Sequence, residues 1–151
     1  MKTSAGTIEH AQKPTPSAAQ SPAQTPAKSH AIDCAGAPPL APGEPAIDLV
    51  HLSRMTHGER ALEREVLDLF DQQAGMLIAR MMSEVPRVMG ALAHTLAGSA
   101  CGIGAWKVAE AAAAVEAAAA RSGAIALTAE MDRLAAAVAD AQAAIAELRQ
   151  H

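Results

Sequence analysis

Aromatic side chains are scarce in this chain, whose 151 residues include one Phe, one Trp and no Tyr. β-Sandwiches and β-barrels draw on aromatic and β-branched residues for their strands, so this scarcity argues against both architectures. Alanine, leucine, glutamate and arginine, which all favour helix, are abundant instead. We therefore expect an all-α protein.

An excess of positive charge is also missing. The formal net charge is −4, which argues against nucleic acid as the main partner, because that usually requires a basic face. The most apolar stretch, VAEAAAAVEAAAA, is interrupted by Glu110 and Glu116 and consists mainly of weakly hydrophobic alanine. We expect no membrane-spanning segment there, and residues 1–46 show no secretory signal.

Cysteine is nearly absent as well. Cys34 and Cys101 are the two cysteines, and they have neither the spacing of metal ligands nor the pattern of a disulfide framework. A reduced, cytoplasmic location is the resulting expectation. The chain has no Walker A motif, and the glycines of GIGAWK follow a predicted helix rather than a strand, which excludes a dinucleotide fingerprint. We expect no cofactor and no bound metal.

Composition changes sharply near residue 46. Eight of the nine prolines lie in residues 1–46, where strong hydrophobes are few. Such a segment buries too little apolar surface to offset the entropy of ordering it, so we expect a disordered Pro/Ala-rich tail or linker. A proline-rich motif that binds a partner is the alternative. The second predicted unit is a helical domain over residues 47–151.

Helical periodicity begins at Ile47. Asp48 is placed to cap a short leading helix that carries Leu49, Leu52 and Met55. Further helices are expected over residues 59–82, 86–102, 105–121 and from an N-cap at Thr128 towards the C-terminus. Short connections favour antiparallel neighbours, so the simplest arrangement is an up-down four-helix bundle with a short leading helix. Residues 109–146 contain 20 alanines in 38 positions, which predicts close packing of the last two helices.

His94 stands out within ALAHTLAGSACGIGAW, a stretch of otherwise small and apolar residues. At about 100° per residue, an apolar stripe falls opposite His94; its members are Val85, Met89, Leu92, Leu96, Ser99 and Ile103. We therefore expect His94 to point away from the core. The residues within about 60° of it are small: Gly90, Ala91, Ala97 and Gly98. Arg87 and Cys101 share the same outward line, each one heptad away.

Two glycines in an exposed helix interior are costly, at ~1 kcal/mol each relative to alanine. Their presence is explained if they clear space for a partner to reach the imidazole, which is then available as a nucleophile. The partner-docking surface predicted in this way consists of Arg87, Gly90, Ala91, Ala97, Gly98 and Cys101. The alternative from the residues alone is an ordinary surface histidine.

The stretch LAHTLAGSACGIGAWKVAEAAAAVE resembles the histidine-containing phosphotransfer (HPt) family. The family helix reads roughly A-H-x-L-K-G-S/A-A, and a glycine-containing turn and a helix with A-x-x-[LV]-E follow it. The residues that match are Ala93, His94, Leu96, Gly98, Ser99, Ala100, then Gly102, Gly104 and Ala105, then Ala112, Val115 and Glu116. The segment MTHGERALEREVLDLF looks like the family's leading segment, so the resemblance covers about residues 47–150.

This resemblance implies a four-helix bundle that relays phosphoryl groups between aspartates of receiver domains, often downstream of a hybrid histidine kinase. Carried over, His94 is the phosphoacceptor, Gly98 provides clearance beside it, and catalysis comes mainly from the receiver or kinase. We expect a monomeric carrier rather than an enzyme. The alternative is a degenerate member that binds receivers without carrying phosphate.

One position departs from the family pattern. The family commonly has lysine three residues after the histidine, next to the phosphoryl oxygens, and this chain has Ala97. The departure predicts a weaker phospho-His94 or a changed partner preference. Arg87 lies about 10.5 Å from His94 along the helix axis, so it is expected to contact the partner rather than the phosphoryl group.

Overall fold

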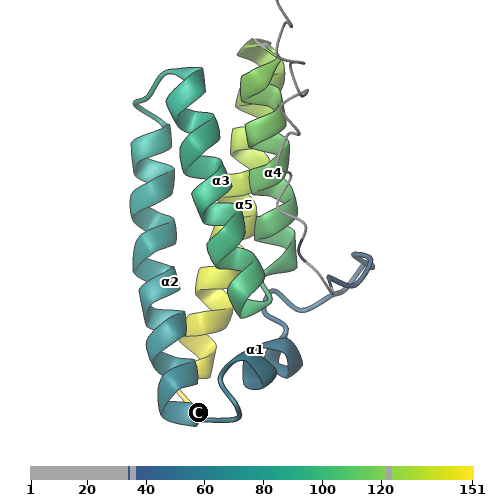
Figure 1. The fold of residues 1–151 in the computed structure, drawn as a ribbon, viewed down its shortest axis with the longest axis vertical. Helices are drawn as coiled ribbons and strands as arrows, with labels where there is room; N and C mark the ends of the chain where they lie inside the picture. Colours follow the sequence, from purple (N-terminus) through teal and green to yellow (C-terminus); the bar gives the residue numbers. More distant parts are fainter. Residues whose placement is uncertain (1–33, 35–36, 122–123) are drawn as a thin grey trace, which may run out of the picture.

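The computed structural model describes residues 34, 37–121 and 124–151, and within these ranges the chain forms five helices and no strand. The helices are α1 (Leu49–Met55), α2 (Arg60–Met81), α3 (Pro86–Ile103), α4 (Trp106–Ala120) and α5 (Ala124–Leu148). Helices α2 to α5 run alternately up and down, and α1 lies beneath one end of the bundle (Figure 1). The expected all-α bundle with a short leading helix is confirmed. The tail predicted over residues 1–46 falls largely outside the described residues.

Local signals in the sequence account for the helix ends. The Asp48 carboxylate accepts a hydrogen bond from the His51 backbone N–H at 2.9 Å, so it caps α1 as expected. His57 (φ 55°) and Gly58 (φ 75°) adopt left-handed backbone conformations in the turn before α2. Pro86 occupies the first turn of α3, and Gly104 (φ 75°) ends that helix in the left-handed conformation that glycine adopts without strain.

The predicted start of the last helix is wrong. Helix α5 begins at Ala124, and Thr128 lies inside it, where its hydroxyl donates to the Ala124 carbonyl at 3.1 Å. Threonine inside a helix bonds the preceding turn in this way, and the alanines around it favour continuation of the helix. The side of α5 that faces the bundle carries Leu134, Val138 and Ile145, which are all buried.

The core combines large apolar side chains with many alanines. The large, fully buried ones include Leu52, Met81, Leu96, Leu134 and Ile145. Much of the remaining core is alanine, and α3 packs most extensively against α4. On the other side of the bundle, Arg149 of the C-terminal end pairs with Asp68 and Asp71 of α2. No helix in the described part of the chain is both long enough and apolar enough to cross a membrane.

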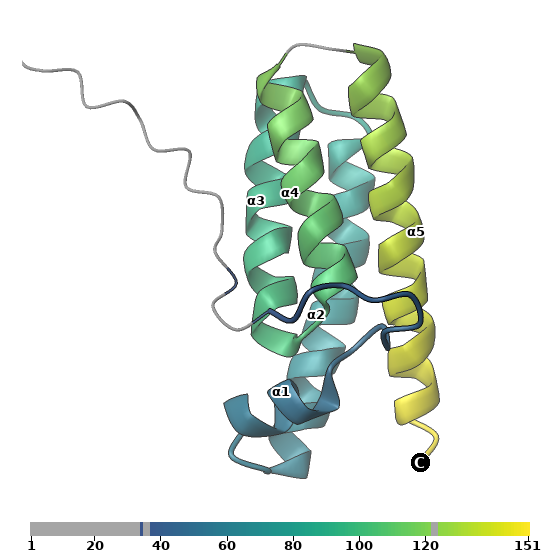
Figure 2. The ribbon, with the colours of Figure 1, turned by 90° about the vertical axis from the view of Figure 1, so that its right-hand side faces the viewer.

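Residues 37–48, here called the N-terminal arm, cross α4, reach α5 and return to α1 (Figure 2). Ile47 is 3 % exposed and belongs to the core. The Lys107 ammonium donates to the Glu44 carbonyl at 2.7 Å, and the Asp48 N–H donates to the Gly104 carbonyl at 2.9 Å. The Trp106 side chain is buried at this end of the bundle, and its indole N–H donates to the Asp48 carboxylate at 3.2 Å. The downstream end of the arm is therefore fixed to the turn between α3 and α4.

Candidate functional site

His94 lies near the middle of α3, and its side chain is 41 % exposed. Its Nδ1 atom is 3.1 Å from one carboxylate oxygen of Glu116 and 3.2 Å from the other. Glu116 comes from α4 and is itself 34 % exposed. The imidazole therefore stands at the surface of the α3–α4 pair, with one ring nitrogen held by the neighbouring helix.

This contact determines which nitrogen of His94 is reactive. An ionised carboxylate only accepts hydrogen bonds, so Nδ1 must carry the proton and donate it to Glu116. In the neutral ring the lone pair is then on Nε2. In this neutral tautomer, the partly exposed imidazole presents the Nε2 lone pair of a nucleophile.

Close approach of α3 to α4 brings Glu116 to His94. Gly90 is buried, and a Cβ atom added to it would lie 3.4 Å from the Ala119 Cβ and 3.9 Å from the Glu116 carbonyl oxygen. Ala93, Ala97 and Ala100 are also buried on this side of α3. Small residues at the interface thus allow the two helix backbones to lie close together, which places a side chain of α4 beside the ring.

The predicted role of Gly90 and Ala97 on the partner-docking surface is therefore wrong. Both were expected to be exposed and to clear space for a partner, but Gly90 is buried and Ala97 is 2 % exposed. Val85, assigned to the core from the sequence, is 62 % exposed. The buried positions of α3 centre roughly 110° from His94 at about 100° per residue, not opposite it. The prediction from hydrophobicity placed the core face of α3 wrongly, because the buried face is lined mainly by glycine and alanine, which are weakly hydrophobic.

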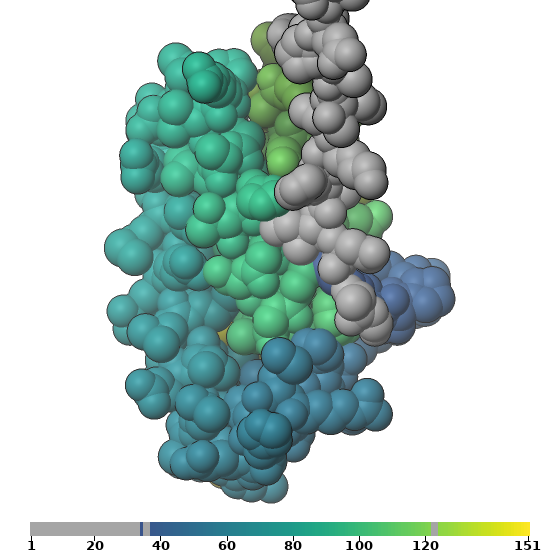
Figure 3. Space-filling view, viewed as in Figure 1, coloured from purple at the N-terminus to yellow at the C-terminus, as the bar shows by residue number. Residues whose placement is uncertain are grey.

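Three of the predicted docking residues do lie at the surface. Arg87, Ala91 and Gly98 are exposed, and each falls within about 60° of His94 around the axis of α3. The surface of α3 emerges beside that of α2 in the space-filling view (Figure 3). These residues and the imidazole form a continuous outward strip of the helix, here called the His94 face.

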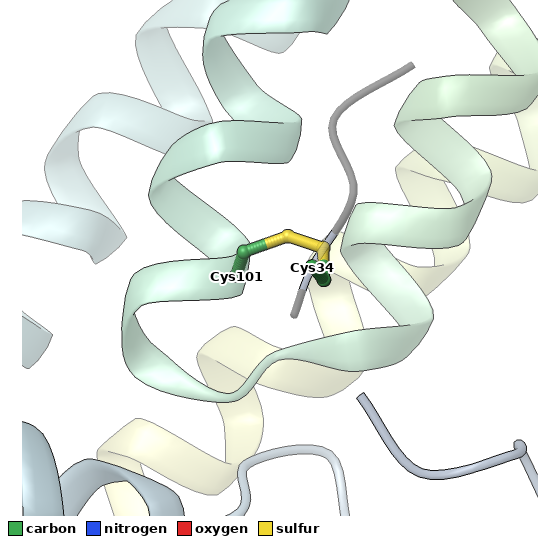
Figure 4. Close-up of a disulfide and its surroundings, with 2 residues drawn as sticks. All are labelled: Cys34 and Cys101. Carbon is green, nitrogen blue, oxygen red and sulfur yellow. A yellow bond between two sulfur atoms is a disulfide. The ribbon is translucent and has the colours of Figure 1, made fainter. Parts of the chain in front are cut away.

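Cys101 was expected to be a surface residue without a covalent partner, and this is wrong. It forms a disulfide with Cys34, and the two Cα atoms are 5.6 Å apart (Figure 4). The cysteines are separated by 67 residues in sequence. Spacing alone does not reveal that the N-terminal segment passes beside the end of α3, so the pairing could not be predicted.

Glu116 is the residue of the candidate site that the sequence did not reveal. Helical periodicity places it on α4 but does not show which residue of another helix it contacts. Its match to the glutamate of the family pattern was the available signal, although that match did not indicate a contact with His94.

Comparison with known families identifies the domain that carries this site. A family model described as Hpt domain matches residues 65–149, which is more than half of the chain. The matched region covers most of α2 and all of α3 to α5, and so includes His94 and Glu116. No curated protein and no solved structure matches the chain.

Proposed function

The chain belongs to the Hpt domain family, and from this premise we propose that it carries a phosphoryl group on His94 in a two-component phosphorelay. Hpt domains are phosphotransfer modules of two-component signalling. The observation that carries the assignment to His94 is its contact with Glu116, which keeps the proton on Nδ1. The free Nε2 is then the phosphoacceptor atom.

In the proposed reaction, Nε2 attacks the phosphorus of an aspartyl phosphate on a receiver domain. A P–N bond forms as the bond from phosphorus to the aspartate oxygen breaks, and the receiver regains its carboxylate. The ring becomes positively charged as Nε2 is phosphorylated, and the Glu116 carboxylate at Nδ1 offsets that charge. Attack by the carboxylate of a second receiver reverses these bond changes and returns His94 to its starting state.

The partner supplies most of the catalysis in this proposal. Phosphoryl transfer depends mainly on positioning and on neutralising charge on the transferred group. The His94 face presents Arg87 and the small residues Ala91 and Gly98 to the partner. We propose that a receiver domain or a hybrid histidine kinase docks there on a monomeric chain in the cytoplasm. The protein then acts as a carrier rather than an enzyme.

A second candidate function rests on Ala97. The family's usual lysine is missing there, so this chain supplies no cation from that position to offset the charge of a phosphoryl group on His94, and Ala97 itself is buried. A member of this kind could bind receivers through the His94 face without carrying phosphate. Transfer assays distinguish the two functions.

The test is transfer of radiolabelled phosphate from a panel of receiver domains that have been phosphorylated with a small phosphodonor. The wild-type chain should acquire label that is lost in acid and retained in base, as expected for phosphohistidine. His94→Gln should acquire none, while the control His151→Gln, which changes an exposed histidine at the C-terminus, should behave as wild type. Label that persists in His94→Gln would remove His94 from the reaction. Receivers that bind the wild type but never label it would favour the second function.

A further inference from the structure

The Cys34–Cys101 disulfide lies on the side of the molecule where the proposed partner must dock. Cys101 follows His94 by two turns of α3, about 10.5 Å along the axis and within about 20° around it. A standard protein–protein interface covers about 800 Å² on each partner, which corresponds to a disc of about 16 Å radius. An interface of that size centred on His94 therefore includes Cys101 and whatever is bonded to it.

Two different kinds of contact hold the N-terminal segment. The downstream end of the N-terminal arm is fixed by the buried Ile47 side chain and by the hydrogen bonds of Glu44 and Asp48 to the α3–α4 region. Further upstream, residues 39–43 are exposed. Within the described part of the chain, the backbone hydrogen bonds of residues 37–43 join residues three positions apart and do not reach the helices. Over the described residues from 34 to 43, the disulfide is thus the one bond that reaches the bundle.

The bond is accessible, and the bundle does not depend on it. Cys34 and Cys101 are both only partly buried and pack at the edge of the core, so the bond is not sealed inside the bundle. The core is built from α1 to α5 and Ile47, and none of the largest buried side chains lies upstream of residue 47. Breaking the bond should release the upstream part of the arm and leave the bundle intact.

We propose that Cys34 and Cys101 form a redox latch that controls access to the His94 face. In the disulfide state Cys34 is held beside the end of α3, inside the area that a docking receiver would cover, and obstructs it. In the dithiol state it is released and the face is open. This proposal rests on the proposed function, because it concerns docking at the same histidine.

The redox step is an ordinary thiol–disulfide exchange. A low-molecular-weight disulfide such as oxidised glutathione accepts two electrons and two protons from the two cysteine thiols, which gives the Cys34–Cys101 bond and two small thiols. A dithiol reductant reverses the reaction. Disulfides in reducing compartments are usually transient and redox-sensing, which agrees with a latch.

The test compares the full chain in its oxidised and reduced forms, with the state of the cysteines verified by mass and by thiol titration. Transfer from the receiver that labels the wild type fastest should be about fivefold or more faster in the reduced form. Labelling by phosphoramidate, a small donor that needs no docking, should be similar in both forms. Cys34→Ser changes a residue outside the helices and should transfer at the reduced rate under both conditions.

Receiver binding and hydrogen exchange test the latch without phosphate. Binding of the unphosphorylated receiver should be weaker to the oxidised form, and peptides covering residues 34–44 should exchange faster after reduction. The latch would be overturned if the transfer rate, the receiver affinity or the hydrogen-exchange rate were the same in the oxidised and reduced chains. It would also be overturned if Cys34 and Cys101 remained free thiols in the presence of the oxidant. By contrast, a reduced chain that neither phosphoramidate nor a receiver can label contradicts the proposed function, while binding and exchange still decide the latch.

Discussion

At the scale of single residues, the proposed function depends on one pair, His94 and Glu116. A histidine on a helix surface can exchange between two tautomers, and a carboxylate at Nδ1 selects the one with a free Nε2. Glu116 is a positioning residue in this account, because it acts through the ring rather than on the phosphoryl group. Its contribution should therefore be visible both in the rate of transfer and in the state of the ring.

We expect Glu116→Gln to slow phosphorylation of His94 by about tenfold or more. The amide is neutral and can either donate to or accept from the ring, so it neither fixes the tautomer nor offsets the developing positive charge. Transfer rates from a receiver measure the first effect, and nitrogen chemical shifts of the His94 ring report the tautomer. Glu110→Gln, an exposed glutamate on the same helix, is the matched control. Unchanged rate and ring shifts in Glu116→Gln would argue that the contact has no role in the reaction.

At the scale of secondary-structure elements, the connection between α3 and α4 positions the site. Gly104 ends α3 with φ 75°, and its carbonyl accepts the Asp48 N–H at 2.9 Å. A Cβ atom at Gly104 would lie 2.9 Å from the Asp48 Cβ and 3.0 Å from the Asp48 carbonyl oxygen. The short turn therefore sets the approach of α3 to α4 and also holds the end of the N-terminal arm.

Gly104→Ala should destabilise the fold by about 2 kcal/mol or more, because a left-handed alanine is strained and its Cβ collides with Asp48. Gly102, two residues earlier and helical, has open space where a Cβ would lie. Gly102→Ala should leave stability unchanged or raise it by up to ~1 kcal/mol. Urea unfolding followed by circular dichroism measures both variants. Similar midpoints for the two would show that the turn does not require glycine at residue 104.

At the scale of the whole molecule, Asp48 links three parts of the chain. Its carboxylate caps α1 and accepts the Trp106 indole N–H from α4, while its backbone N–H bonds the α3–α4 turn. The hydrogen bond from the His51 backbone, followed by the bond from Trp106, lowers the pKa of Asp48 below its ordinary value of 3.8 against the opposing effect of burial. The charged form is thus favoured in the folded state.

This lowered pKa has a definite consequence for acid stability. Because the pKa of Asp48 is lower in the folded than in the unfolded chain, its stabilisation is complete above the ordinary value of 3.8 and is lost as pH falls through the folded value. Asp48→Asn keeps a cap acceptor but does not titrate and loses the Trp106 bond, so it should be about 1 kcal/mol less stable at pH 7. That difference should shrink towards pH 3 in urea unfolding. A difference that stays constant with pH would contradict the assignment.

Local chemistry in the sequence was sufficient for the helices and their order. The Asp48 cap and the helical periodicity arise from residues a few positions apart, so they could be recognised without the fold. The prediction that Thr128 caps the last helix was wrong because a threonine hydroxyl can either cap a helix or bond a backbone carbonyl inside one. His94 was found because small residues surround it in the sequence and because its neighbours match a family pattern, but nothing along the chain shows which atoms surround the ring.

The sequence by itself determined an all-α chain, an up-down bundle and the candidate histidine, because capping, periodicity and motif are properties of neighbouring residues. Only the tertiary structure decided which face of α3 is buried, since glycine and alanine line that face and carry little hydrophobic signal. It also decided that Glu116 holds the Nδ1 atom of His94 and that Cys34 reaches Cys101. Those two contacts join residues 22 and 67 positions apart, and such distances are set by packing rather than by spacing along the chain.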